Sequence, residues 1–118
     1  MSISILIVDD DPIFVQSAAD MLETAGFRVV RGASTAAEAR EAIRSLGPDA
    51  VLMDVNLPDG DGIALAAELC DKGDGPSVLL TSSDPSAAPR RVVERSGAIG
   101  FLSKTDLTCA DFAALFGL

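Results

Sequence analysis

The chain has 118 residues and a formal net charge of −9, with 9 Lys and Arg against 18 Asp and Glu. This length suits one domain that buries roughly two thirds of its unfolded surface. The sequence contains no His, Trp or Tyr, which excludes a Ser-His-Asp or Cys-His catalytic set, a His-ligated zinc or haem, and a phosphohistidine within this chain. The negative balance argues against nucleic acid or an anionic membrane as the main partner.

The acids are mostly aspartate, and Asp collects at helix caps, turns and oxygen-ligand metal sites. Cys70 and Cys109 stand alone in apolar contexts, so we expect reduced thiols in a cytoplasmic protein. The apolar run from Ile3 to Val8 is too short to span a bilayer and is followed at once by three acids. It therefore predicts neither a signal peptide nor a membrane anchor.

Short apolar runs alternate along the chain with segments of helical spacing. The runs are rich in β-branched residues and nearly continuous, which is typical of strands buried on both faces of a parallel sheet. They predict strands over residues 3–8, 27–31, 50–53, 77–81 and 99–103.

Capping residues agree with the helical periods between these strands. Asp11 before Pro12 predicts the start of the first helix, and Thr35 to Glu38 has the form of a capping box for the second. The remaining expected helices are a third that includes residues 63–70, a short fourth over 89–96 because of Pro85 and Pro89, and a fifth over about 107–116. Gly26, Gly47 and Gly97 close the first, second and fourth.

Five β-α units in one short chain predict an α/β fold, a doubly wound parallel sheet with helices on both faces. No linker, repeat or second domain interrupts the sequence, so we expect one domain over residues 1–118. In such sheets the functional site lies at the carboxyl ends of the strands.

The predicted strand ends carry the most reactive side chains of the chain. Asp9 to Asp11 follow the first strand, and Asp54 follows the third. Thr81 with Ser82 closes the fourth strand, and Lys104, one of only two lysines, follows the fifth. Three carboxylates beside one lysine carry a local charge of about −2 and favour a bound cation. Mg²⁺ suits such an oxygen-rich place, and a carboxylate can act as a nucleophile towards phosphorus to form an aspartyl phosphate.

The chain resembles the receiver domain of two-component response regulators over essentially its whole length. Four motifs in the right order and spacing carry the resemblance: residues 5–11 (ILIVDDD), 51–62 (VLMDVNLPDGDG), 78–82 (VLLTS) and 100–104 (GFLSK). The resemblance implies a flavodoxin-like receiver fold of five parallel strands in the order 2-1-3-4-5. It also implies a role in phosphorelay signal transduction.

The resemblance also implies a role for each matching residue. Asp54 would be the phosphoacceptor, while Lys104 would pair with the phosphate and Thr81 would be the switch hydroxyl. Mg²⁺ would be held by Asp9, Asp10, Asp54 and the main-chain carbonyl of Asn56. Phe101 falls where the family has a switching aromatic, although a phenylalanine in the last strand is as readily a core residue.

The function implied is that of a signalling phosphoacceptor, with no activity beyond Mg²⁺-dependent self-phosphorylation and autodephosphorylation. A sensor histidine kinase or a histidine phosphotransfer protein would supply the phosphoryl group. A downstream protein or a fused output domain would read the switch, with the chain a monomer or a phosphorylation-dependent dimer. No output domain is visible, and no direct binding to nucleic acid or membrane is expected.

Two departures from the family pattern leave an alternative open. Thr105 stands where the family often has a proline after the lysine, and the fourth helix is short and preceded by prolines. The alternative is a receiver-like interaction module that works without phosphorylation. Asp11 is interpreted as a helix cap, and Asp59 and Asp61 as turn and cap residues, so all three are left outside the site.

Overall fold

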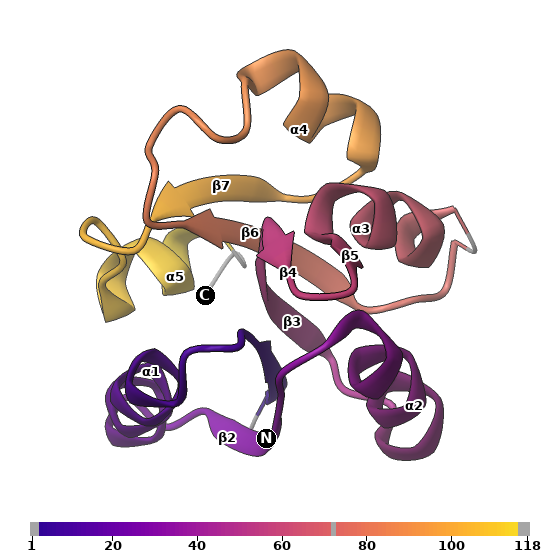
Figure 1. Cartoon of the computed structure of the whole chain (residues 1–118). Helices are drawn as coiled ribbons and strands as arrows, with labels where there is room; N and C mark the ends of the chain where they lie inside the picture. The colour runs from indigo at the N-terminus through magenta and orange to yellow at the C-terminus, as the bar shows by residue number, and fades with distance from the viewer. Residues whose placement is uncertain (1–2, 72, 116–118) are drawn as a thin grey trace.

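The computed structural model describes residues 3–71 and 73–115, apart from the side chains of Arg31 and Cys109. Its main sheet has five parallel strands in the order β2-β1-β3-β6-β7 (Figure 1). This is the predicted order 2-1-3-4-5. The bounds are Ser4–Val8 for β1, Arg28–Ala33 for β2, Ala50–Asp54 for β3, Ser77–Ser82 for β6 and Gly100–Ser103 for β7.

β1 and β3, two of the three interior strands, are apolar on both faces because helices cover both faces of the sheet. Every residue of β1 and β3 is buried, and alternate residues enter two separate cores. Leu6 and Val51 face one core, whereas Ile5 and Leu52 face the other. This arrangement explains why these strands are continuous apolar runs without alternation.

The helices divide between the two faces (Figure 1). α1 (Pro12–Thr24) and α5 (Cys109–Leu115) cover one face, with Leu22 and Phe112 fully buried against the sheet. The other face is covered by α2 (Ala36–Leu46), α3 (Gly62–Cys70) and α4 (Arg90–Ser96). The predicted fifth helix reaches Phe116, which lies outside the described residues.

Helix caps follow the sequence with one difference. The Asp11 carboxylate accepts a hydrogen bond from the Ile13 N–H at the start of α1, and Thr35 Oγ1 accepts one from the Glu38 N–H at the start of α2. In a full capping box Glu38 would return a bond to the Thr35 N–H. Here the Glu38 carboxylate accepts from the N–H and hydroxyl of Ser34, one residue earlier.

A small hairpin that the strand pattern does not predict follows β3. Its strands, β4 (Asn56–Leu57) and β5 (Gly60–Asp61), pair antiparallel around the predicted turn. Asp61 then caps α3 by accepting from the Ile63 N–H, as expected. Two residues per strand are too few for any periodicity to show in the sequence.

The free thiol of Cys70 is half-buried, and burial raises its pKa. The side chain of Cys109 lies outside the described residues, so the reduced state of the two cysteines stays a prediction. Among the described helices, none is both long and apolar enough to cross a membrane.

Close packing of α3 on the backbone of β3 needs a glycine at position 62. The Gly62 N–H donates to the Val55 carbonyl at 2.7 Å, and an ideal Cβ on Gly62 would overlap the Asp54 carbonyl group. Gly60, two residues earlier, has far more room, because its Cβ would meet only the Ala36 Cβ at 3.8 Å.

We expect Gly62→Ala to lower the free energy of unfolding by about 3 kcal/mol, because the methyl group must displace the backbone of β3. Gly60→Ala is the matched control and should change the free energy of unfolding by less than about 0.5 kcal/mol. Urea unfolding monitored by circular dichroism measures both. Equal losses for the two variants would contradict this account.

Candidate functional site

The carboxyl ends of four strands bring the predicted site residues to one edge of the sheet. Asp54 ends β3 and pairs in register with Thr81 of β6. Asp9 directly follows β1, and Lys104 directly follows β7, where the Lys104 N–H donates to the Ser82 carbonyl at 2.8 Å. Residues 50 positions apart thus meet because parallel strands end at a common edge.

Three carboxylates form the acidic part of this cluster. Asp9 and Asp54 are buried and Asp10 is exposed, and one carboxylate oxygen from each lies within 4.8 Å of the others. Oxygens that share an octahedral Mg²⁺ at about 2.1 Å lie at most about 4.2 Å apart. The donor set and its spacing therefore fit Mg²⁺ after only small side-chain movements.

Lys104 supplies the positive charge of the site. Its Nζ lies 2.7 Å from Asp9 Oδ2 and 3.4 Å from Asp54 Oδ2. Burial alone would lower the pKa of Lys104, but the hydrogen bond and charge of Asp9, together with Asp54, outweigh it and raise that pKa. For Asp9 the balance is opposite, since burial raises the pKa of its carboxyl despite the bonds from Lys104 and the Asp11 N–H.

The Thr81 hydroxyl is fully buried beside Asp54. No described residue forms a hydrogen bond with Thr81 Oγ1. A buried hydroxyl without a partner has an unmet donor and acceptor, which costs free energy unless another group arrives. The hydroxyl is thus available to a group that binds at Asp54.

Asn56 and Phe101 lie at the margins of the cluster. The Asn56 N–H donates to Asp54 Oδ1 at 3.0 Å, which places the backbone of β4 against that carboxylate. Phe101 is half-buried on β7, where it packs against the core beneath α4 and lines a groove. It is not in contact with the acids, so the structure brings together the acids, Thr81 and Lys104, with Asn56 adjacent and Phe101 outside.

Two further residues support the site: Phe14 contacts Lys104, and Asp59 anchors the hairpin that carries Asn56. The Phe14 ring on α1 lies 4.5 Å from Lys104 Nζ, a distance typical of a cation–π interaction. Phe14 belongs to the apolar stripe of α1, and no local signal in the sequence distinguishes it from an ordinary core residue. Its contact depends on the fold, because α1 and the residue after β7 are distant in sequence.

Asp59 is the second such residue, and it ties the hairpin to α2. Its carboxylate accepts from the N–H groups of Ala36 and Ala37, at 2.7 and 3.1 Å. The bond from the Ala36 N–H is the main reason why the pKa of Asp59 is lowered. The predicted turn around Asp59 is confirmed, but the turn residue also caps a helix that precedes it in the chain.

The loop after Lys104 has its own hydrogen bonds in place of a proline. The Lys104–Thr105 peptide is trans. Ser103 Oγ contacts Thr105 Oγ1 at 3.1 Å and donates to Asp106 Oδ2 at 2.9 Å, and the Asp106 N–H returns to the Ser103 carbonyl. These bonds hold Lys104 in place without proline.

The doubly wound sheet thus places three aspartates, a threonine and a lysine at its carboxyl edge, where such sheets carry their functional sites. The chain belongs to the response regulator receiver domain family, because the sequence pattern of that family matches residues 5–108. Receiver domains are phosphoacceptors of two-component systems, with Mg²⁺ bound at an acidic pocket. They interact with histidine kinases or phosphotransfer proteins and with output domains.

Relatives agree with this assignment. The chain is 32% identical over 113 residues to a protein-glutamate methylesterase/protein-glutamine glutaminase of Archaeoglobus fulgidus, covering 94% of this chain and 32% of that protein. It is 38% identical over 104 residues to the positive alginate biosynthesis regulatory protein of Pseudomonas aeruginosa, covering 86% and 41%. A CheY-like receiver domain protein from Methanospirillum hungatei superposes with a TM-score of 0.82 at 25% identity, covering 99% and 92%. The chain thus spans less than half the length of these two curated relatives.

Burial of the Asp9 carboxylate makes the stability of the metal-free fold depend on pH. Because the pKa of Asp9 in the folded chain is raised above its usual 3.8, the unfolded chain releases this proton at a lower pH than the folded chain does. The free energy of unfolding therefore falls as the pH rises from the unfolded pKa to the folded pKa. We expect Asp9→Asn to remove this fall, so that the free energy of unfolding of the metal-free variant declines less between about pH 4 and about pH 7 than that of wild type.

Urea unfolding in EDTA at about pH 4 and about pH 7 measures the decline for each chain. Asp11→Asn is the control, since Asp11 is exposed and caps α1 outside the acid cluster. An Asp9→Asn chain whose free energy of unfolding declines as steeply with pH as that of wild type would contradict this account.

Proposed function

We propose that this chain is one receiver domain over residues 1–118 and that Asp54 accepts the phosphoryl group. The main support is the position of Asp54, which is buried at the sheet edge between Thr81 and the Lys104 ammonium. The donor is the phosphohistidine of a sensor kinase or phosphotransfer protein, because the chain has no histidine of its own.

In the transfer step an oxygen of the Asp54 carboxylate attacks phosphorus. The new P–O bond forms as the P–N bond to the donor imidazole breaks, and the imidazole leaves with the electron pair and takes up a proton. Lys104 stands 3.4 Å from Asp54 Oδ2, within reach of a phosphoryl oxygen on that carboxylate. An ammonium there stabilises the charge that builds on the transferring group.

Asp9, Asp10, Asp54 and the Asn56 main-chain carbonyl would hold Mg²⁺ in this proposal. When bound, the ion would neutralise part of the phosphoryl charge and orient the phosphoryl oxygens. The residues around it keep the site ordered: Lys104 balances the buried acids, and the Asn56 N–H orients the Asp54 carboxylate by donating to Oδ1.

The switch begins at Thr81, whose buried hydroxyl has no partner among the described residues. The hydroxyl donates to a phosphoryl oxygen on Asp54, because the two residues are paired in register on adjacent strands. Thr81 then moves towards Asp54, and Phe101 on the neighbouring strand follows into the space this leaves. Water hydrolyses the acyl phosphate and resets the site.

Intact mass spectrometry after incubation with Mg²⁺ and acetyl phosphate tests the phosphoacceptor. We expect one added phosphoryl group on the wild type and none on Asp54→Ala. Lys104→Met should slow the reaction by about 10²-fold, since it removes one positioned charge from the transition state. A phosphoryl group that persists on Asp54→Ala would refute the assignment, and Mg²⁺ binding without any transfer would favour the interaction module.

The Asp59 bond offers a test of the proposed Asn56 ligand. Asp59 holds the hairpin that carries Asn56, and both Asp59 and Thr35 cap α2. Asp59→Ala should weaken Mg²⁺ binding about tenfold, the scale expected when a group that orients a ligand is lost.

Thr35→Ala is the matched control, because it removes a cap from the same helix without touching the hairpin. It should lower the free energy of unfolding by about 1 kcal/mol and leave Mg²⁺ affinity unchanged. Isothermal titration calorimetry measures the affinity. Equal weakening in the two variants would mean that α2 as a whole, and not the hairpin, positions the metal ligands.

A further inference from the structure

The Lys104 ammonium has three contacts among the described residues, and one of them is uncharged. Nζ lies 2.7 Å from Asp9 Oδ2, 3.4 Å from Asp54 Oδ2 and 4.5 Å from the centre of the Phe14 ring. The Lys104 side chain is only 14% exposed. The attraction between a cation and the face of an aromatic ring grows when water is excluded, so the ring of Phe14 stabilises this ammonium more than it would at the surface.

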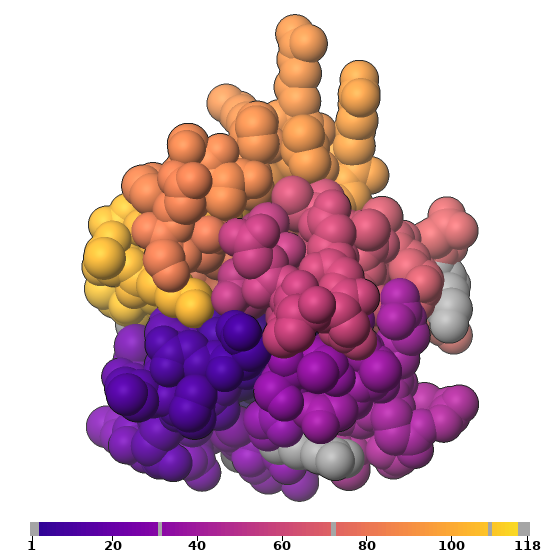
Figure 2. All heavy atoms as spheres, in the orientation of Figure 1, coloured from indigo at the N-terminus to yellow at the C-terminus, as the bar shows by residue number. Residues whose placement is uncertain are grey.

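The start of α1 fixes the position of the Phe14 ring. Phe14 is the third residue of this helix, whose first turn is held by Pro12 and by the bond from the Ile13 N–H to the Asp11 carboxylate at 3.0 Å. The half-buried ring also packs against the core beneath α1. Figure 2 shows the indigo atoms near the start of the chain directly against the yellow atoms near its end. The ring is thus a fixed surface beside a flexible lysine.

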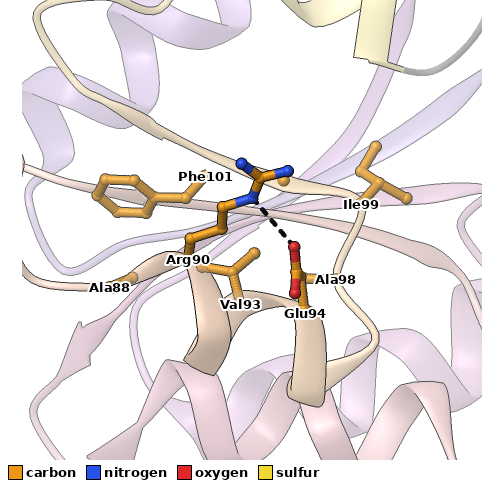
Figure 3. A pocket seen from close by; sticks show the side chains of 8 residues that line it. Ala88, Arg90, Val93, Glu94, Ala98, Ile99 and Phe101 are labelled. Atoms are coloured by element: carbon orange, nitrogen blue, oxygen red, sulfur yellow. Dashed lines mark hydrogen bonds and ion pairs between the residues drawn. The ribbon is translucent and has the colours of Figure 1, made fainter.

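Phe101 is closer to Lys104 in the sequence but does not share this contact. It lies on β7, three residues before Lys104, and packs against the core beneath α4. Figure 3 shows its side chain in the groove beside α4, together with Val93 and Ala88. Among the described residues, Phe14 is therefore the aromatic side chain that holds the ammonium.

The side chain of Lys104 needs a support that has no other task in the site. Its backbone is anchored by the bond from its N–H to the Ser82 carbonyl at 2.8 Å, but the ammonium ends a flexible four-carbon chain that loses much rotamer freedom when it is ordered. Asp9 and Asp54 contact the ammonium, yet they are also the proposed metal ligands. The Phe14 ring binds neither metal nor phosphate, so it can hold the ammonium throughout the reaction.

We propose that Phe14 is a positioning residue for phosphoryl transfer, whose ring face holds the Lys104 ammonium beside Asp54. The inference rests on the proposed function, because it concerns the charge that stabilises the transferring group. Its effect on the rate comes from order: an ammonium already in place stabilises the transition state without first being fixed there.

Successive fluorination of the Phe14 ring separates this role from simple packing. Fluorine draws electron density from the ring face and so weakens the attraction for a cation, while the ring changes little in size. A ring that only fills space is insensitive to one, two or three fluorine atoms. A ring that holds an ammonium loses its grip stepwise along the same series.

The contact itself is tested in the metal-free chain, by urea unfolding in EDTA. We expect 3,4,5-trifluorophenylalanine at position 14 to raise the equilibrium constant for unfolding about fivefold more in the wild-type background than in the Lys104→Met background. The second background measures what fluorine does to packing alone, so the difference reports the coupling between ring and ammonium. An equal change in the two backgrounds would overturn the proposal.

The role in transfer is tested by the rate at which acetyl phosphate with Mg²⁺ adds a phosphoryl group, followed by intact mass. The rate should fall progressively with fluorine number at position 14, by about fivefold at three fluorine atoms. Phe27 is the matched control, since it is also half-buried against the core beneath α1, contacts Phe112 edge-on and has no described cation over its ring. The same series at position 27 should leave the rate within about twofold of wild type.

Three rate patterns would overturn the proposal. These are rates that do not change with fluorine number at position 14, equal falls at positions 14 and 27, and rates that rise with fluorine number, which would mean that the ring draws the ammonium away from Asp54. Failure of the proposed function gives a different result. An unmodified chain that takes up no phosphoryl group would refute that function, and the role of Phe14 in transfer with it, even where the unfolding series detects the coupling.

Discussion

The ion pair between Lys104 and Asp9 is the interaction on which the site depends. Its 2.7 Å contact draws the residue after β7 towards the residue after β1, across the end of β3 where Asp54 lies. Two buried carboxylates at this edge would repel each other without a cation, so Lys104 makes the acidic edge compatible with a folded chain. The Phe14 ring holds the same ammonium from the side of α1. The ion pair that balances the acidic cluster thus also links two strands that are distant in the sequence.

Much of the fold follows from local physical rules that the sequence displays directly. Continuous apolar runs predict β1 and β3 because both faces of these strands are covered. Asp11 and Thr35 predict helix starts because a short polar side chain can satisfy a free N–H at that position. The clustering of Asp9, Asp54 and Lys104 needs only the rule that parallel strands end together.

The remainder depends on contacts that no local pattern encodes. Phe14 could not be distinguished from a core residue, since only the packing of α1 brings it to Lys104. The role of Asp59 was missed because its partners, Ala36 and Ala37, precede it by more than 20 positions. The strand ends predict that Lys104 meets the acids, but its closer pairing with Asp9 than with Asp54 depends on side-chain positions that only the folded chain determines.

The bond from Asp59 to α2 constrains the length of the turn as well as its composition. The carboxylate reaches the Ala36 N–H only because the turn between β4 and β5 has its present number of residues. An extra residue there would move the carboxylate off the helix and shift the hairpin relative to Asp54. Surface turns usually tolerate insertions. This one should not, so relatives of this chain that keep an acidic residue at position 59 should also keep the turn ungapped.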